Sequence, residues 1–248
     1  MKTVFINCSP KKRFCASAYF ISLERLFVGG EKVTEALRKK TDHERILQQL
    51  KDADTVVFSI PLYVDGLPSH VMRFLEDLER FSRENGLHFS VYCIANNGFI
   101  EGCQNEPLMQ ILERFCTRSG LKWCGGTGIG GGVMLNVTRI LFYVQIGMVL
   151  LNMLLSGIQS GNFFPAGLLK GFARNVLILL FLNIGVLFFL GRMGRAIQRR
   201  EFFGKRYTRI LIPSFIFILF ADSFFVIISI FEGGIFRGWL AKKRPDSI

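Results

Sequence analysis

The sequence predicts an α/β protein with a doubly wound parallel sheet, followed by an all-α membrane region. Three observations support this prediction. Up to about residue 132, short β-rich runs alternate with helical runs, which is the pattern of parallel βαβ units. Beyond that point the chain contains long uncharged runs. The basic excess of the chain lies beside those runs, where it would flank membrane helices.

The expected strands and helices alternate regularly along the first part of the chain. Strands are predicted at residues 3–8, 32–37, 55–60, 89–95 and 121–127. Helices are predicted at residues 17–27, 42–53, 69–81 and 106–119. Asp42 is an N-cap candidate, because Ile46, Leu47 and Leu50 follow it at helical spacing. A parallel sheet of this kind is covered by helices on both faces.

The second part of the chain carries three apolar runs. Residues 140–169 contain no charge, residues 175–191 contain none between Arg174 and Arg192, and residues 210–231 contain only Asp222. A 22-residue helix is roughly 33 Å long, which matches the hydrocarbon core of a bilayer. We expect three spanning helices, with two spans and a re-entrant piece as the alternative. The domains are therefore predicted as residues 1–132 and a membrane-anchoring region of residues 133–248.

The charge distribution excludes nucleic acid as the expected partner. Residues 1–138 carry 17 basic and 15 acidic residues, whereas residues 139–248 carry 14 and 4, so most of the net charge of +12 belongs to the apolar part. A nucleic-acid binder needs its cations on a solvated face of a folded domain. Cations beside apolar runs instead indicate contact with membrane lipid.

The positive-inside rule gives an orientation at the cell membrane. Residues 192–209 hold seven cations against Glu201, so this segment is expected on the cytoplasmic side. The chain opens without a signal-peptide pattern, which also places the first domain in the cytosol. Three spans would leave the basic tail, with Arg237 and Lys242, outside. A hairpin around Pro213 and Asp222 would instead return the tail to the cytosol.

Cysteine and histidine spacing predicts no metal site. The six cysteines all lie in the first part, without a C-x-x-C pair, and are read as small apolar residues. The three histidines lie outside the apolar runs, which excludes a membrane haem held by paired histidines. His70 follows a strand-end loop and is interpreted as a solvated residue at a helix start, with a position facing the active site as the alternative.

The first strand leads into a loop suited to a phosphate. This loop reads Asn7-Cys8-Ser9-Pro10-Lys11-Lys12-Arg13, and Ser17 stands near the start of the next helix. In an open α/β sheet, backbone amides and a helix N-terminus meet at the carboxyl ends of the strands. The hydroxyls and cations of this loop suit a phosphate monoester, and a solvated basic turn is the alternative.

Two further strand-end loops complete a recognisable pattern. The loop after the third strand reads Pro61-Leu62-Tyr63-Val64-Asp65-Gly66-Leu67-Pro68, and the loop after the fourth begins Ala95-Asn96-Asn97-Gly98-Phe99. A rigid turn that carries an aromatic side chain can pack along a flat heterocycle. With these loops, residues 1–132 resemble the flavodoxin-like NAD(P)H-dependent FMN reductase and quinone reductase family.

This resemblance implies an FMN site shared by the three loops. It places Ser9, Lys11, Ser17 and Ala18 around the FMN phosphate. It places Pro61, Leu62, Tyr63 and Val64 along the isoalloxazine ring, and Asn96, Asn97 and Gly98 at the pyrimidine side. Two features depart from the family pattern: Cys8 replaces a glycine, and Phe14, Cys15 and Ala16 occupy positions that are usually small or polar.

The resemblance implies an FMN-dependent oxidoreductase that takes electrons from NAD(P)H, and the apolar runs predict that it is anchored to the membrane. A membrane anchor suggests a quinone or another lipid-phase acceptor, and family members are commonly homodimers. No catalytic side chain is assigned, since the cofactor would carry the hydride chemistry. The alternative is a binding or scaffold module with a degraded FMN pocket. The glycines from Gly125 to Gly132 are read as a strand-end loop or hinge, and not as a second nucleotide site.

Overall fold

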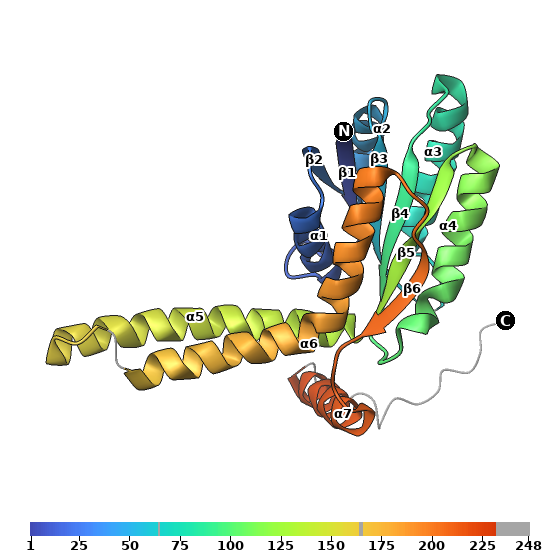
Figure 1. Ribbon diagram of the computed structural model, residues 1–248. Coiled ribbons are helices and arrows are strands. Elements are labelled where there is room, and N and C mark those ends of the chain that lie inside the picture. Colours follow the sequence, from blue (N-terminus) through green and yellow to red (C-terminus); the bar gives the residue numbers. More distant parts are fainter. Residues whose placement is uncertain (64, 164–165, 232–248) are drawn as a thin grey trace, which may run out of the picture. The chain divides into compact units, whose positions relative to one another are not determined.

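The computed structural model describes residues 1–63, 65–163 and 166–231, which form two units. The first unit is Met1–Leu211 and the second begins at Ile212. Within the first unit lies a six-stranded, all-parallel sheet in the order β2-β1-β3-β4-β5-β6 (Figure 1). The first five strands have the flavodoxin-like order 2-1-3-4-5. The predicted doubly wound flavodoxin-like fold is confirmed by this order.

The predicted elements form within a few residues of their expected bounds. The first five strands are β1 Lys2–Asn7, β2 Glu31–Ala36, β3 Thr55–Pro61, β4 Ser90–Asn96 and β5 Lys122–Gly130. The helices between them are α1 Ala16–Phe27, α2 His43–Leu50, α3 Ser69–Asn85 and α4 Glu106–Ser119, with short 3₁₀ turns at Lys40–Asp42 and Gly102–Asn105. Asp42 does precede α2, but its carboxylate accepts hydrogen bonds from the amides of Arg38 and Lys39.

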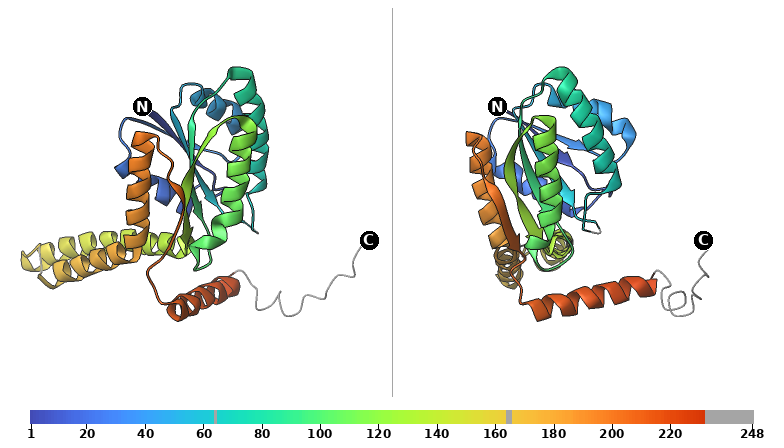
Figure 2. Two further views of the ribbon diagram at one scale, coloured as in Figure 1. Left: turned by 45° about the vertical axis from the view of Figure 1, so that its right-hand side comes forward. Right: turned by 90° about the vertical axis from the view of Figure 1, so that its right-hand side faces the viewer.

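The central strands are buried on both faces, as their nearly continuous apolar runs require. Alternate residues Val4, Val56, Phe58 and Val91 face a core that is shared with α2, α3 and α4. On the opposite face, α1 packs against β3 and β4, and the second half of α6 packs against β5. Figure 2 shows the helices on the two sides of the sheet.

The glycine-rich segment is part of β5, which corrects its interpretation as a loop or hinge. Gly126, Gly128 and Gly130 are buried within this strand. A Cβ on Gly126 would collide with the backbone of Cys93, and one on Gly130 with the backbone of residues 100–102. These glycines therefore allow the close approach of neighbouring backbones. The residue at the strand end, Gly131, has a φ of +69° and turns the chain into α5.

Helices α5, Gly132–Ser160, and α6, Ala166–Arg199, form a hairpin that leaves the sheet at the end of β5 (Figure 1). From residue 141 onward, large apolar side chains of α5 are exposed, among them Leu141, Met148, Leu151 and Ile158. The first half of α6 is similar, with Leu177 and Phe181 exposed. Both helices are long and apolar enough to cross a membrane. We call residues 140–182 the apolar hairpin.

The second half of α6 belongs to the sheet. Val186, Leu190, Met193 and Ile197 are fully buried there, and Figure 1 shows α6 bending between its two halves. Gly185 lies near this change and packs close to the Thr208 hydroxyl. The apolar hairpin is thus inserted between β5 and the last helix that covers the sheet.

Strand β6, Gly204–Arg209, is an edge strand that the sequence pattern did not predict. It pairs with β5 from Gly125↔Gly204 to Gly130↔Arg209. The domain boundary was predicted at residue 132, whereas the compact unit runs to Leu211 because the second half of α6 and β6 complete the sheet. The region after residue 132 therefore contains a strand as well as helices.

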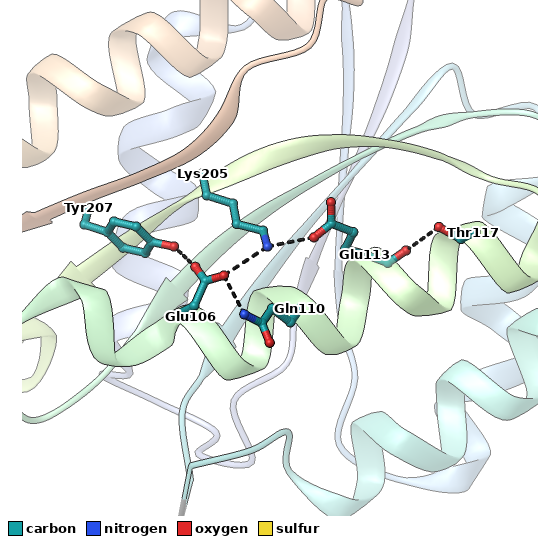
Figure 3. Close-up of polar contacts among 6 residues, drawn as sticks. All are labelled: Glu106, Gln110, Glu113, Thr117, Lys205 and Tyr207. Carbon is teal, nitrogen blue, oxygen red and sulfur yellow. Dashed lines mark hydrogen bonds and ion pairs between the residues drawn. The ribbon is translucent and has the colours of Figure 1, made fainter.

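Side chains fasten β6 to α4 (Figure 3). The Lys205 ammonium lies 3.0 Å from Glu106 Oε1 and 2.7 Å from Glu113 Oε2, and the Tyr207 hydroxyl donates to Glu106. Partial desolvation lowers the pKa of Lys205, but the two carboxylates outweigh this effect and raise it. An edge strand with few apolar residues is held in this way by polar contacts.

The second unit is described through helix α7, Ser214–Phe231, which is the third predicted apolar run. Phe215, Leu219, Phe220 and Ile227 are exposed on this helix, as is Asp222. The basic tail, whose side of the membrane the sequence left open, lies outside the described residues.

Candidate functional site

The three predicted loops meet at the carboxyl edge of the sheet. In this strand order β1 and β3 are neighbours. After β1 the chain crosses to β2 on one side, and after β3 it crosses to β4 on the other side. The loops after β1 and β3 therefore flank a topological switch point. The backbone amide of Leu62 donates to Asn96 O at 2.8 Å, which joins the loops after β3 and β4. The Asn96 side chain also donates to Ser17 Oγ, which joins the loop after β4 to the start of α1. Partial burial, with a smaller contribution from Cys15, raises the pKa of Tyr63.

Asn7 organises the loop after β1. Its Oδ1 accepts the Ser9 amide at 3.1 Å, and its Nδ2 lies 3.5 Å from Cys15 Sγ. On the other side of the loop, His70 Nε2 lies 3.0 Å from Cys8 O. Because a carbonyl only accepts, this nitrogen must carry the proton. His70 therefore braces the loop, and the interpretation of a merely solvated histidine is incomplete.

The N-terminus of α1 points into this loop and is available to an anion. The helix begins at Ala16, and the N-cap residue Cys15 makes no side-chain capping bond within the described part of the chain. The amides of the first turn, from Ala16 to Ala18, thus lack the usual side-chain acceptor. Such amides, together with the helix dipole, favour a phosphate. The exposed cations of Lys11, Lys12 and Arg13 add positive charge to the same loop.

Ser9 and Ser17 are both deeply buried, at 3% and 1% exposure. Ser17 Oγ accepts a hydrogen bond from Asn96 Nδ2 at 3.1 Å, and Ser9 Oγ accepts from the Lys11 amide at 3.4 Å. A hydroxyl that accepts still has its own proton to donate. Each serine can therefore donate to an anion seated in the loop. The structure thus brings the predicted Ser9, Lys11, Ser17 and Ala18 to one place.

The other predicted residues differ in exposure. Tyr63 is 42% exposed, in a tight turn where it and Gly66 exchange backbone hydrogen bonds. Leu62 and Asn96 are buried, Pro61 is half-buried and Gly98 is exposed. Val64 lies outside the described residues.

Asn97 offers a buried acceptor at the third loop. Its Nδ2 donates to Glu101 O at 3.0 Å, while its Oδ1 is buried and finds no donor among the residues described. An unpaired buried carbonyl oxygen is costly. A ring N–H at the pyrimidine side of a flavin is a donor of the kind that this oxygen lacks.

Two residues of α5 join the site, although sequence reasoning assigned them to the membrane region. Asn136 Nδ2 donates to Phe14 O at 2.6 Å, and Arg139 Nη2 donates to Asn136 Oδ1 at 2.7 Å. The Arg139 guanidinium also stacks 4.8 Å from the centroid of the Tyr19 ring on α1. Asn136 stands just before the first apolar run, and no sequence motif marks it.

Among the described residues, the cysteines form no disulfide, and the candidate metal ligands form no cluster. Cys8, Cys15, Cys93, Cys116 and Cys124 are buried and free, as their apolar reading predicted, while Cys103 is exposed. Burial, with a smaller contribution from Cys93, raises the pKa of Cys8 well above its ordinary value. Within the part of the chain that the structure describes, no three His, Cys, Asp or Glu side chains gather as metal ligands.

Comparisons with known proteins find structural similarity over about half of the chain. No protein-family model matches the sequence, and no curated protein matches it. The Trp repressor binding protein from Bacillus subtilis is 17% identical with a TM-score of 0.43, covering 52% of this chain and 84% of that protein. An NADPH-quinone reductase from P. pentosaceus is 15% identical with a TM-score of 0.42, covering 51% and 83%.

A third solved structure is the general stress protein 14 from Treponema denticola in complex with FMN. It is 12% identical with a TM-score of 0.42, covering 51% of this chain and 84% of that protein. At these values the assignment of the fold rests on the strand order of this chain itself.

Proposed function

We propose that this protein is a membrane-anchored, FMN-dependent NAD(P)H oxidoreductase that passes electrons to a quinone-like acceptor. The observation that carries the proposal is the N-terminus of α1 at the β1–β3 switch point, which has no side-chain cap and has the buried hydroxyls of Ser9 and Ser17 beside it. This arrangement matches a phosphate monoester in charge and in hydrogen-bonding direction.

The residues present fit FMN, and each loop would hold a different part of it. Ser9, Ser17, the amides up to Ala18 and the Lys11 ammonium would hold the phosphate. Pro61, Leu62, Tyr63 and Val64 would line the ring, and Tyr63 is exposed enough to pack on its face. Asn96, Asn97 and Gly98 would take the pyrimidine edge, with Asn97 Oδ1 as acceptor.

When bound, FMN would supply the hydride and electron transfer, while the chain would bind and orient the reactants. Tyr63 and the amide-rich loop after β4 would keep water from one side of the ring. The exposed Gly98 lies in this loop and would leave this side of the site accessible to a nicotinamide from solution.

The membrane anchor is supported by the exposed apolar surface of the hairpin. Large apolar side chains from Leu141 to Ile158 and from Leu177 to Phe181 are about half exposed or more. A contiguous surface of this kind exceeds what soluble proteins leave in water. The 21 residues from 140 to 160 of α5 would span roughly 31 Å. Lys170 and Arg174, near the start of α6, are long enough to reach the headgroups.

The hairpin also supports the cytoplasmic orientation. Because the chain leaves β5 and returns to the sheet through α6, both ends of the hairpin lie on one side of the membrane. The basic residues 192–209 belong to the second half of α6 and to β6, on the same side as the sheet. This placement agrees with the positive-inside rule. A homodimer, implied by the family resemblance, is also part of the proposal.

One observation favours a binding or scaffold module without flavin. The Asn136 side chain of α5 donates a hydrogen bond to Phe14 O. Phe14 has a φ of +51°, which is unusual for a bulky residue. The loop after β1 is therefore fixed by protein contacts that a flavin-free module would also need.

An absorption spectrum of the full chain purified in detergent separates the two functions. Bound flavin, identified as FMN after release by heat, supports the oxidoreductase. A colourless protein that also fails to bind added FMN saturably supports the scaffold.

A further inference from the structure

The loops after β1 and β2 form a strongly basic surface. Its six cations are Lys11, Lys12, Arg13, Arg38, Lys39 and Lys40, which we call the basic rim. All are exposed except the half-buried Arg38, whose Nη2 reaches Lys12 O at 3.5 Å. None of the six forms an ion pair with any residue that the structure describes. Because β1 and β2 are neighbours, the two loops share one corner of the carboxyl edge.

The few acidic groups near the basic rim are already engaged. Asp42 Oδ2 accepts the amides of Arg38 and Lys39, and its Oδ1 lies 3.6 Å from Arg45. Glu35, at the end of β2, pairs with Arg45 as well. The positive charge of the basic rim is therefore not neutralised by its own surroundings.

The opposite, amino edge of the sheet is different. There Lys2 pairs with Asp52 at 2.6 Å, and Asp54 pairs with Arg200 and with the N-terminal ammonium. Lys2, Arg200 and the N-terminal ammonium at the amino edge thus have acidic partners, whereas the cations of the basic rim have none among the described residues. The charge asymmetry runs along the strand direction, toward the edge from which the apolar hairpin leaves.

The basic rim adjoins the base of the apolar hairpin. Arg13 precedes Phe14, whose carbonyl accepts from Asn136 of α5, and Arg139 lies one turn further along α5. The exposed apolar surface begins two residues later, at Leu141. The base of the hairpin, in α5, contacts α1, which is the helix that follows the loop with half of the basic rim.

We propose that the basic rim rests on the anionic phosphate headgroups of the membrane that holds the hairpin. Basic segments next to a membrane helix are attracted by the negative surface potential of the cytoplasmic leaflet. This inference rests on the proposed membrane anchoring. The inference identifies an anionic lipid as the partner of the basic rim. One member of the rim, Lys11, is also assigned to the flavin phosphate. Headgroup contact would also hold the flavin loops at the depth where a lipid-phase acceptor arrives.

Lysine footprinting of the full chain tests this proposal. The protein is reconstituted into phosphatidylcholine vesicles, with or without phosphatidylglycerol, and its lysines are acylated and measured by mass spectrometry. Lys12, Lys39 and Lys40 should react several-fold more slowly in the vesicles that contain phosphatidylglycerol. Lys51 and Lys122, which lie at the amino edge, should react equally in both. Equal reactivity of all five lysines in the two vesicles would overturn the proposal.

An added arm separates lipid phosphate from free phosphate. If FMN, and not phosphatidylglycerol, protects Lys12, Lys39 and Lys40, the surface belongs to the flavin site and the proposal is wrong. Raising the salt concentration should remove protection given by headgroups, since screening weakens exposed charge interactions.

Charge-neutral variants provide a second measurement. The triple variant K12Q/K39Q/K40Q should lose the enrichment of phosphatidylglycerol over phosphatidylcholine among lipids that copurify with the protein. The variant K51Q/K122Q is the matched control and should keep that enrichment. Undiminished enrichment in the triple variant would contradict the proposal. Carbonate extraction of the same membranes reports separately on the anchor, so failure of the anchor and failure of the lipid surface are distinguishable.

Discussion

The hydroxyl of Tyr19 on α1 donates a hydrogen bond to Asn183 Oδ1 on α6, at 3.0 Å across 164 residues of sequence. Both side chains are buried. Asn183 stands where α6 leaves the apolar hairpin and joins the sheet, and Asn183 Nδ2 is bonded to Leu179 O at 2.9 Å. Burial raises the pKa of Tyr19 to about 12, although the Arg139 charge opposes this rise. The bond therefore joins α1, which covers the sheet, to the end of the apolar hairpin.

Tyr19→Phe should destabilise the protein by about 1 to 3 kcal/mol, because Asn183 Oδ1 would keep its burial and lose its donor. Thermal unfolding of the full chain in detergent measures this change. Tyr143→Phe is the control, since Tyr143 is 56% exposed on the hairpin. The Asn183→Ala variant completes a double-mutant cycle. Additive effects of the two changes would show that this bond does not join the two elements energetically.

Replacing Ser9 and Ser17 together by alanine should weaken FMN binding by roughly two to four orders of magnitude. Each hydroxyl would lose a charge-assisted bond to the phosphate, worth about 1.5 to 3 kcal/mol. Riboflavin has no phosphate, so its affinity should hardly change. Quenching of flavin fluorescence by the full chain measures both ligands. An equal loss for FMN and riboflavin would indicate a damaged fold and not a lost phosphate contact.

Tyr63→Ala should weaken FMN and riboflavin alike, since this change removes contact with the ring and leaves the phosphate loop intact. The same titration measures it. Phe99→Ala is a suitable control, because Phe99 is exposed at the same edge and is not assigned to the ring. A loss of affinity for FMN but not for riboflavin would indicate that Tyr63 contacts the phosphate and not the ring.

Glu24 should make stability fall as pH rises. This side chain on α1 is fully buried, and neither of its oxygens has a hydrogen-bond partner in the described structure. Burial raises its pKa well above the ordinary 4.5. Well below pH 4.5 the carboxyl is neutral in both the folded and unfolded states. At higher pH the unfolded chain releases the proton first, so folding becomes progressively less favourable up to the folded pKa.

Glu24→Gln should remove this part of the pH dependence. The melting temperature of the variant relative to wild type should therefore rise with pH above about 4.5. Glu24→Met is a second neutral variant that adds no amide in need of partners. Glu44→Gln, at an exposed position of α2, is the control and should follow wild type. A constant offset between Glu24→Gln and wild type across the pH range would contradict a raised pKa.

A fragment ending at residue 132 should be much less stable than one that keeps the second half of α6 and β6. It would expose the face that Val186, Leu190, Met193 and Ile197 cover, at about 1.5 to 3 kcal/mol for each side chain. The sum is on the order of 10 kcal/mol as an upper estimate, comparable with the whole stability of a typical domain. The Tyr92 hydroxyl would also lose its bonds to Ala196 O and Glu201 O.

The matched variant for comparison keeps residues 1–211 and replaces residues 140–182 by a short glycine-serine linker. Arg139 and Asn183 both contact Tyr19, so a few residues suffice to join them. This shortened protein should be soluble without detergent and should unfold cooperatively. The full chain should instead stay in the membrane pellet after a carbonate wash. Release of the full chain into the supernatant would count against spanning helices.

The first five strands and their helices could be predicted from the amino-acid pattern alone. Short β-rich runs of six or seven residues that alternate with amphipathic helices leave few arrangements other than a parallel sheet with two covered faces. The site loops were predicted for the same reason, because in such a sheet ligands bind where the strands end. Ser9, Ser17 and Tyr63 could be named because each belongs to one of those loops, whereas Asn97 was named through the resemblance to the FMN reductase family.

The end of the domain, by contrast, depends on tertiary contacts. Strand β6, Gly-Lys-Arg-Tyr-Thr-Arg, has no apolar pattern, since its place at the sheet edge depends on backbone pairing with β5 and on the ion pairs of Lys205. Both halves of α6 carry apolar side chains. Those of the second half pack on the sheet, whereas those of the first half are exposed on the apolar hairpin. Hydrophobicity alone does not show whether an apolar helix segment packs against protein or against lipid. The roles of Asn136 and Asn183 likewise come from contacts across more than 120 residues, which no local pattern records.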